Sequence, residues 1–112
     1  MEPILERVGS VTVVFLPTDT LDASNVKEFK RDVGSVINER KKVVFDLERV
    51  NFVDSSGLGA ILSCLRQLNA QGGDLKLCSL GKPVRALFEL VRMHRIFDIY
   101  NCKDEAIRAF EN

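Results

Sequence analysis

Residues 43–59 read VVFDLERVNFVDSSGLG and join three elements in one run. Val43–Leu47 is β-branched and apolar apart from one aspartate, which predicts a buried strand. A polar segment follows Phe52-Val53, and from Leu58 to Leu68 leucine and isoleucine recur at helical spacing. This order of strand, polar loop and helix is typical of an α/β domain whose loop lies at the carboxyl end of the sheet.

The region before this run shows the same order of elements. Val11–Leu16 predicts another buried strand, and Ile4–Val8 predicts an antiparallel edge strand that pairs with it. Asp22 is expected to cap a helix whose apolar stripe runs from Val26 to Ile37. A strand, a helix of about four turns and another strand form a βαβ unit, so the strands at 11–16 and 43–47 should run parallel.

The region after residue 59 continues the alternation. Gly72-Gly73 is expected to end the helix, because glycine accepts a left-handed backbone. Leu75–Cys78 alternates like a strand, and Pro83 opens a third helix. Ile96–Tyr100 and Asp104–Phe110 predict a last short strand and a terminal helix. We therefore expect one α/β domain over residues 1–112, with a four- to five-stranded, mostly parallel mixed sheet covered by about four helices.

The composition argues against several kinds of partner. Sixteen basic and sixteen acidic residues give zero net charge, without the basic excess of a nucleic-acid-binding domain. Three cysteines without a C-x-x-C pair favour a reducing compartment. No signal-peptide pattern or membrane-spanning run occurs, so we expect a cytoplasmic protein that binds neither nucleic acid nor membrane. The neutral charge and the lack of an obvious exposed apolar stripe permit a monomer.

The segment Asp54–Gly59 carries the chemistry that we expect. It places two serines at the start of a helix and two glycines in its first turns, and each glycine costs about 1 kcal/mol relative to alanine. This segment and Asp19–Asn25 each follow a parallel strand, so both should lie at the same edge of the sheet. The glycines then indicate close approach, either to the chain's own sheet or to a partner. On the first alternative Ser55 or Ser56 is an N-cap, and Leu58 belongs to the core.

A phosphate on a serine at this position would be compatible with the fold. It adds about −1.5 to −2 charge, and a helix start offers free N–H groups and the positive end of the dipole. Asp54 and Asp22 would instead repel the added charge. Such a serine is suited to switch a binding surface on and off.

Leu21-Asp22, followed about thirty residues later by Val53-Asp54-Ser55-Ser56-Gly57-Leu58-Gly59, resembles the STAS domain of anti-sigma-factor antagonists. The resemblance implies that Ser55 is the phosphorylation target. It implies an anti-sigma factor that is also a serine kinase as the partner, with a PP2C-like phosphatase to reverse the modification. The kinase holds ATP and Mg²⁺, and this chain needs no cofactor of its own. The implied partner surface comprises Asp22, Asp54, Ser56, Gly57, Leu58 and Gly59.

The sequence departs from the family at Asp19, where the family usually has glycine. Aspartate tolerates the left-handed backbone better than most residues, so the turn should survive. Its negative charge near Ser55 should affect which kinase is accepted.

Two alternatives remain open at the level of sequence. An enzyme would need a base for its serine, yet the serines lack the G-x-S-x-G context and His94 is the only histidine. A phosphoaspartate receiver at Asp54 would need an acidic pair after the first strand and a later lysine, for which Lys82 is the nearest candidate. We therefore expect no catalytic residue and no metal site. The second alternative is a STAS-like binding or scaffold module in another signalling assembly that controls no sigma factor.

Overall fold

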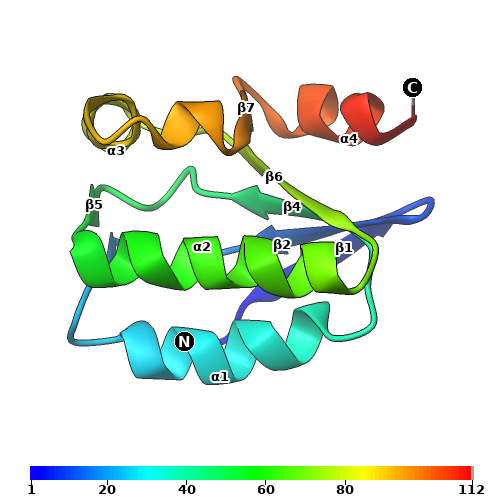
Figure 1. The fold of residues 1–112 in the computed structure, drawn as a ribbon, viewed down its shortest axis with the longest axis horizontal. Coiled ribbons are helices and arrows are strands. Elements are labelled where there is room, and N and C mark those ends of the chain that lie inside the picture. Colours follow the sequence, from blue (N-terminus) through cyan, green and yellow to red (C-terminus); the bar gives the residue numbers. More distant parts are fainter. Residues whose placement is uncertain (112) are drawn as a thin grey trace.

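The computed structural model describes residues 1–111 as a mixed β-sheet with helices on both faces (Figure 1). The main sheet has five strands in the order β1-β2-β4-β6-β7. Strand β1 is antiparallel to β2, and the other neighbouring pairs are parallel. The strands of this sheet are β1 (Ile4–Val8), β2 (Val11–Phe15), β4 (Lys42–Asp46), β6 (Asp74–Cys78) and β7 (Asp98–Tyr100).

Four α-helices within the described residues cover the sheet: α1 (Val26–Ile37), α2 (Ser55–Ala70), α3 (Lys82–Leu90) and α4 (Lys103–Glu111). A short 3-10 helix, η1 (Met93–Arg95), follows α3. The predicted α/β class, the mostly parallel sheet and the parallel pairing of β2 with β4 are confirmed.

The core lies on both sides of the sheet because alternate side chains of β4 point to opposite faces. Val43 and Phe45 join the larger core, which α1, α2 and α3 cover, and the ring of Phe45 meets that of Phe29 on α1 edge to face at 6.1 Å. Val44 points to the other face, which α4 closes with Ala106 and Ile107. Helices α1 and α2 lie side by side in Figure 1 and contact each other.

Two very short strands outside the main sheet form a ribbon that the sequence did not predict as a unit. Strand β3 (Thr20–Leu21) pairs in parallel with β5 (Phe52–Val53). A strand of two residues shows no alternation of apolar and polar side chains, so its pattern is too short to recognise. The two strands follow β2 and β4, respectively, in the chain: β3 lies within the polar segment Asp19–Asn25, and β5 lies immediately before the segment Asp54–Gly59.

Gly57 allows the start of α2 to pack directly against this ribbon. A Cβ atom at residue 57 would lie 2.1 Å from the carbonyl oxygen of Leu21 and 2.9 Å from a methyl carbon of Val53. At Gly59 a Cβ atom would meet nothing within 4 Å. The prediction of close approach is therefore confirmed for Gly57 toward the chain's own backbone, whereas Gly59 leaves an open surface on α2.

Element ends agree with the predictions at some positions and differ at others. Gly72 has a φ of +81° and follows the last turn of α2, as the glycine pair predicted. Val91, which shares the apolar spacing of α3, lies just beyond the helix and is 44% exposed. Strand β7 begins at Asp98 rather than at Ile96. Apolar residues can keep helical spacing in the sequence beyond the last helical residue, so this spacing does not show where a helix ends.

The two glycines of α2 give a matched test of the packing. Gly57→Ala is expected to lower the free energy of unfolding by about 1–3 kcal/mol or more, because backbone atoms of Leu21 cannot move aside easily. Gly59→Ala is expected to leave it unchanged or raise it by up to about 1 kcal/mol. Urea unfolding with an unchanged m-value measures both. Equal effects of the two substitutions would contradict the steric explanation.

Candidate functional site

The β3–β5 ribbon brings the two polar segments of the chain together. Thr20 is paired with Phe52 and Leu21 with Val53, so Asp22 and Asp54 follow neighbouring strands in the same direction. The backbone N–H of Asp54 donates to the carbonyl oxygen of Leu21 at 3.3 Å. The predicted placement of both segments at one edge is therefore confirmed.

Asp54 is the N-cap of α2 and also joins the two segments. Its Oδ1 accepts a hydrogen bond from the N–H of Gly57 at 2.9 Å, and its Oδ2 accepts one from the N–H of Ala23 at 3.1 Å. The alternative in which Ser55 or Ser56 is the N-cap is wrong, because the N-cap residue is Asp54, whose side chain accepts the N–H of Gly57 in the first turn. The hydroxyl of Ser55 is thus not needed for capping, and Ser55 is exposed at the first position of the helix.

Asp22 does not cap α1, which corrects the prediction made for it. The helix begins at Val26, and the residue at its N-cap is Asn25. The Asp22 carboxylate instead accepts hydrogen bonds from the N–H and the hydroxyl of Ser24, at 2.9 and 2.5 Å. The hydroxyl and the N–H of Ser24 hold the pKa of Asp22 below its usual range, so this carboxylate stays charged near neutral pH.

Asn25 organises the loop before α1, and the sequence analysis missed its role. Its side-chain oxygen accepts a hydrogen bond from the N–H of Asp22 at 3.0 Å, and its Nδ2 donates to the carbonyl oxygen of Thr20 at 2.8 Å. An asparagine that bonds to backbone groups close to it in sequence is a common turn-former, and this local signal was available in the sequence. The result is a fixed position for the Asp22 carboxylate.

The remaining predicted residues divide into exposed and buried ones. Ser55 and Gly59 are exposed, and Ser56 is half-buried. Gly57 is buried, and Leu58 is only 7% exposed and belongs to the core. The surface that a partner can touch in this segment is therefore made of small side chains beside two carboxylates.

Asp19 lies at the edge of this surface in an ion pair. The guanidinium Nε of Arg49 is 3.1 Å from its carboxylate. Among the described residues other than glycine, only Glu39, Ser79 and Arg92 have a positive φ. The turn at Asp19 therefore does not use the left-handed backbone that we expected it to tolerate, and Arg49 offsets the added negative charge.

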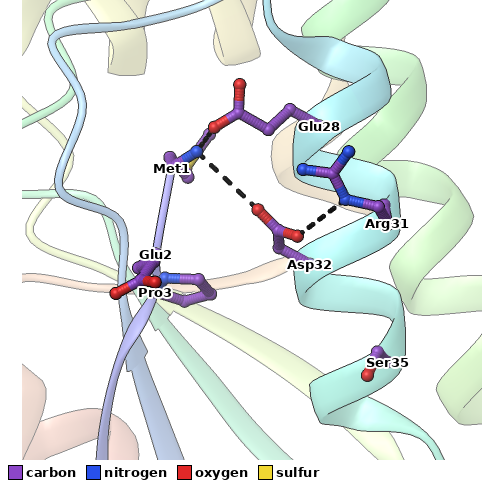
Figure 2. A pocket seen from close by; sticks show the side chains of 7 residues that line it. All are labelled: Met1, Glu2, Pro3, Glu28, Arg31, Asp32 and Ser35. Atoms are coloured by element: carbon purple, nitrogen blue, oxygen red, sulfur yellow. Dashed lines mark hydrogen bonds and ion pairs between the residues drawn. The ribbon is translucent and has the colours of Figure 1, made fainter.

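A hollow of about 630 Å³ lies between the N-terminal segment and α1, as Figure 2 shows. Two of its three acidic side chains have partners: Asp32 pairs with Arg31 at 3.0 Å, and Glu28 pairs with the amino group of Met1. None of the residues labelled in Figure 2 belongs to the segments around Asp22 and Ser55. This hollow is separate from the predicted site.

The cysteines and the histidine lie in ordinary structural positions. Burial raises the pKa of the Cys64 thiol to about 12 and that of Cys78 to about 11, so both stay protonated and pack as small apolar side chains. His94 is exposed on η1. No group of three or more His, Cys, Asp and Glu side chains among residues 1–111 is arranged to hold a metal ion. None of the helices in that range is long and apolar enough to cross a membrane.

These features define a small α/β module whose most distinctive surface is an exposed serine at a helix start, beside two fixed carboxylates. The model of the STAS domain family matches residues 2–106, and the chain belongs to this family. An anti-sigma F factor antagonist of Paenibacillus polymyxa is 33% identical over 109 residues, which cover 96% of this chain and 92% of that protein. The family thus includes regulators of sigma-factor control.

Solved structures agree with this assignment. A candidate anti-sigma factor antagonist from Thermotoga maritima superposes with a TM-score of 0.90 at 26% identity, over 98% of this chain and 95% of that one. The Bacillus cell fate determinant SpoIIAA, solved in its phosphorylated form, gives a TM-score of 0.71 at 25% identity, over 96% of this chain and 98% of that one.

Asp54 should contribute measurably to stability because it makes two hydrogen bonds with one side chain. Asp54→Ala is expected to lower the free energy of unfolding by about 1–3 kcal/mol, from loss of the cap and of the bond to Ala23. Asp54→Asn keeps one side-chain oxygen as an acceptor, so it should lower the free energy of unfolding less than Asp54→Ala does. Urea unfolding gives the order of the three proteins. An alanine variant within about 0.5 kcal/mol of wild type would show that the loops are held together by the ribbon alone.

Proposed function

We propose that this chain is an anti-sigma-factor antagonist switched by phosphorylation of Ser55. The unphosphorylated form binds an anti-sigma factor that is also a serine kinase, and so releases a sigma factor. The kinase transfers the γ-phosphoryl group of ATP to the Ser55 oxygen, with ADP as the leaving group and loss of the hydroxyl proton. A PP2C-like phosphatase then hydrolyses the ester. Use of ATP accords with action in the cytoplasm, and the free protein is expected to be a monomer.

The observation that carries this proposal is the exposure of Ser55 at the first position of α2, with Asp54 as the cap. A modification of Ser55 therefore removes no hydrogen bond on which the helix start depends. The family relationship supports the choice of partner, since a relative is named as an anti-sigma F factor antagonist. The phosphorylated form of SpoIIAA supports a covalent switch within this fold.

Charge supplies the mechanism of the switch. The carboxylates of Asp22 and Asp54 lie in adjoining loops, linked through the N–H of Ala23. A phosphate on Ser55 changes the local charge from about −2 to about −4. The free N–H groups of the helix start accommodate this charge within the chain. A partner surface that fits the neutral serine would have to bury the added charge. Binding of the partner is therefore weakened.

The first test is the intact mass of the protein after incubation with the cognate anti-sigma kinase and Mg-ATP, followed by peptide mapping. One added phosphate on Ser55, with loss of kinase binding, is the expected result. Stable binding without phosphate would instead favour an unmodified binding module in another signalling assembly. Phosphate on Ser56 alone would show that the switch had been assigned to the wrong serine.

Variants of Ser55 separate charge from fold. Ser55→Ala is expected to keep the fold and to bind the kinase permanently, and Ser55→Asp to weaken binding by about 2–5 kcal/mol. The control with the same change of charge is Ser35→Asp. Ser35 is exposed in the last turn of α1, away from the loop that holds Asp22, and this variant should bind the kinase like wild type. Calorimetric titration gives the affinities. Wild-type affinity in the Ser55→Asp protein contradicts the charge mechanism.

Asp22 should act on recognition more than on stability. In Asp22→Asn the side-chain oxygen can still accept the N–H of Ser24, so the midpoint of thermal unfolding should change little. The rate of Ser55 phosphorylation, or kinase affinity, should fall because a fixed negative charge of the partner surface is lost. A large loss of thermal stability with unchanged binding would give Asp22 a structural role only.

A further inference from the structure

Apolar side chains are exposed along one side of α3 and on the neighbouring β5. Leu90 is 80% exposed, Phe52 53% and Val91 44%; Pro83 is exposed and Leu87 half-buried. We call these five residues the α3 strip. Exposed apolar residues that lie together commonly mark an interaction surface, whereas single ones need no explanation.

Helix geometry places the strip on one flank of α3. Pro83 and Leu87 are four residues apart and Leu90 lies three residues after Leu87, so these side chains are neighbours along the helix, and Val91 follows directly at the C-cap. Val84 and Phe88 form the buried side of α3. No exposed apolar stripe is obvious in the sequence, whereas in the structure the apolar residues of α3 extend from its buried side onto the exposed flank.

The strip borders a hollow of about 240 Å³ between α3 and β5. Asn51, Phe52 and Val53 line one wall, and Pro83, Val84 and Leu87 line the other. An apolar side chain of a partner can therefore enter between the helix and the ribbon rather than rest on a flat surface.

The ends of the strip are basic. Residues 82–95 contain Lys82, Arg85, Arg92 and Arg95 but only one acidic residue, Glu89, while the whole chain has no net charge. All but Arg85 of these basic residues are exposed. The α3 strip thus combines an apolar centre with a local excess of positive charge.

We propose that the α3 strip binds an acidic amphipathic helix of a protein partner. From Pro83 to Val91 the strip extends roughly 12 Å, which matches about two turns of a docked helix with apolar anchors at i, i+3 and i+4. Acidic residues beside those anchors complement the basic ends. A second copy of this chain would place a basic strip on a basic strip, and like charges oppose that arrangement.

The strip is close in the chain to the proposed phosphorylation site, because Phe52 lies on β5 and Asp54 and Ser55 follow that strand directly. This deepens the proposed function, on which the identity of the partner rests: the kinase that contacts Ser55 carries the helix. The strip extends the contact beyond the phosphorylation site, on a surface that the phosphate does not cover.

The test uses a stapled amphipathic peptide of about 15 residues, with leucine on one face and glutamate on the other, titrated into the isotopically labelled chain. Saturable amide shifts are expected at Phe52 and along residues 83–96. Phe52→Gln and Leu90→Gln should each weaken binding about tenfold. Ile4→Gln is the matched control, because Ile4 is 58% exposed on the far edge strand β1, and it should bind like wild type.

Further arms separate the competing occupants. A peptide with lysine in place of glutamate should bind at least about tenfold more weakly. Ser55→Asp should bind the acidic peptide like wild type, so a failure of the kinase switch is distinguishable from a failure of the strip. The proposal is overturned if no saturable shifts occur, if both peptides bind equally, or if the shifts lie elsewhere. The proposal would also be overturned, in favour of a membrane surface, by a different result: the protein sediments with phosphatidylglycerol vesicles, substitutions in the α3 strip abolish this, and the peptide does not bind.

Discussion

The arrangement of the site depends on one carboxylate. The two oxygens of Asp54 accept the N–H groups of Gly57 and Ala23, which belong to segments more than thirty residues apart in the chain. The ribbon beneath them has only two residues per strand. Hydrogen bonds to an ionised acceptor are stronger than neutral ones. The start of α2 and the loop after β3 are thereby held as one unit, and Ser55 takes its position from that unit.

A second constraint acts through the absence of a side chain. At Gly57 the helix lies so close to Leu21 that any Cβ atom would overlap a backbone carbonyl. The first turn of α2 therefore rests on backbone rather than on side chains that can rearrange. On the proposed function, a charge added at Ser55, two residues before Gly57, is therefore expected to leave this turn of the helix in place. The expected effect of the added charge is on the affinity for a protein that binds this exposed surface.

The main sheet and its helices could be predicted because their patterns are long. The apolar run of Val11–Leu16 and the helical spacing of Val26–Ile37 are each long enough to recognise, and packing in the structure agrees with both. The ribbon could not be recognised from two-residue strands. The N-cap position of Asn25 was missed because aspartate at residue 22 has the same preference for a helix start, and only the observed start of α1 at Val26 separates the two. The Asp19–Arg49 pair joins residues thirty positions apart, and sequence spacing does not show such contacts. Exposure of Leu90 depends on how α3 is rotated against the sheet, which periodicity gives only approximately.

The motif from Asp54 to Gly59 contains two parts that answer to different demands. Asp54 and Gly57 are required by the chain's own backbone, whichever protein binds it. Ser55 is exposed, and the helix cap does not use its hydroxyl. Across a family, the two architectural residues and the proposed phosphorylation site can therefore diverge at different rates. On the proposed function, a sequence that retains the aspartate and the glycine but not the serine is expected to build the same module as a permanent rather than a reversible binding partner.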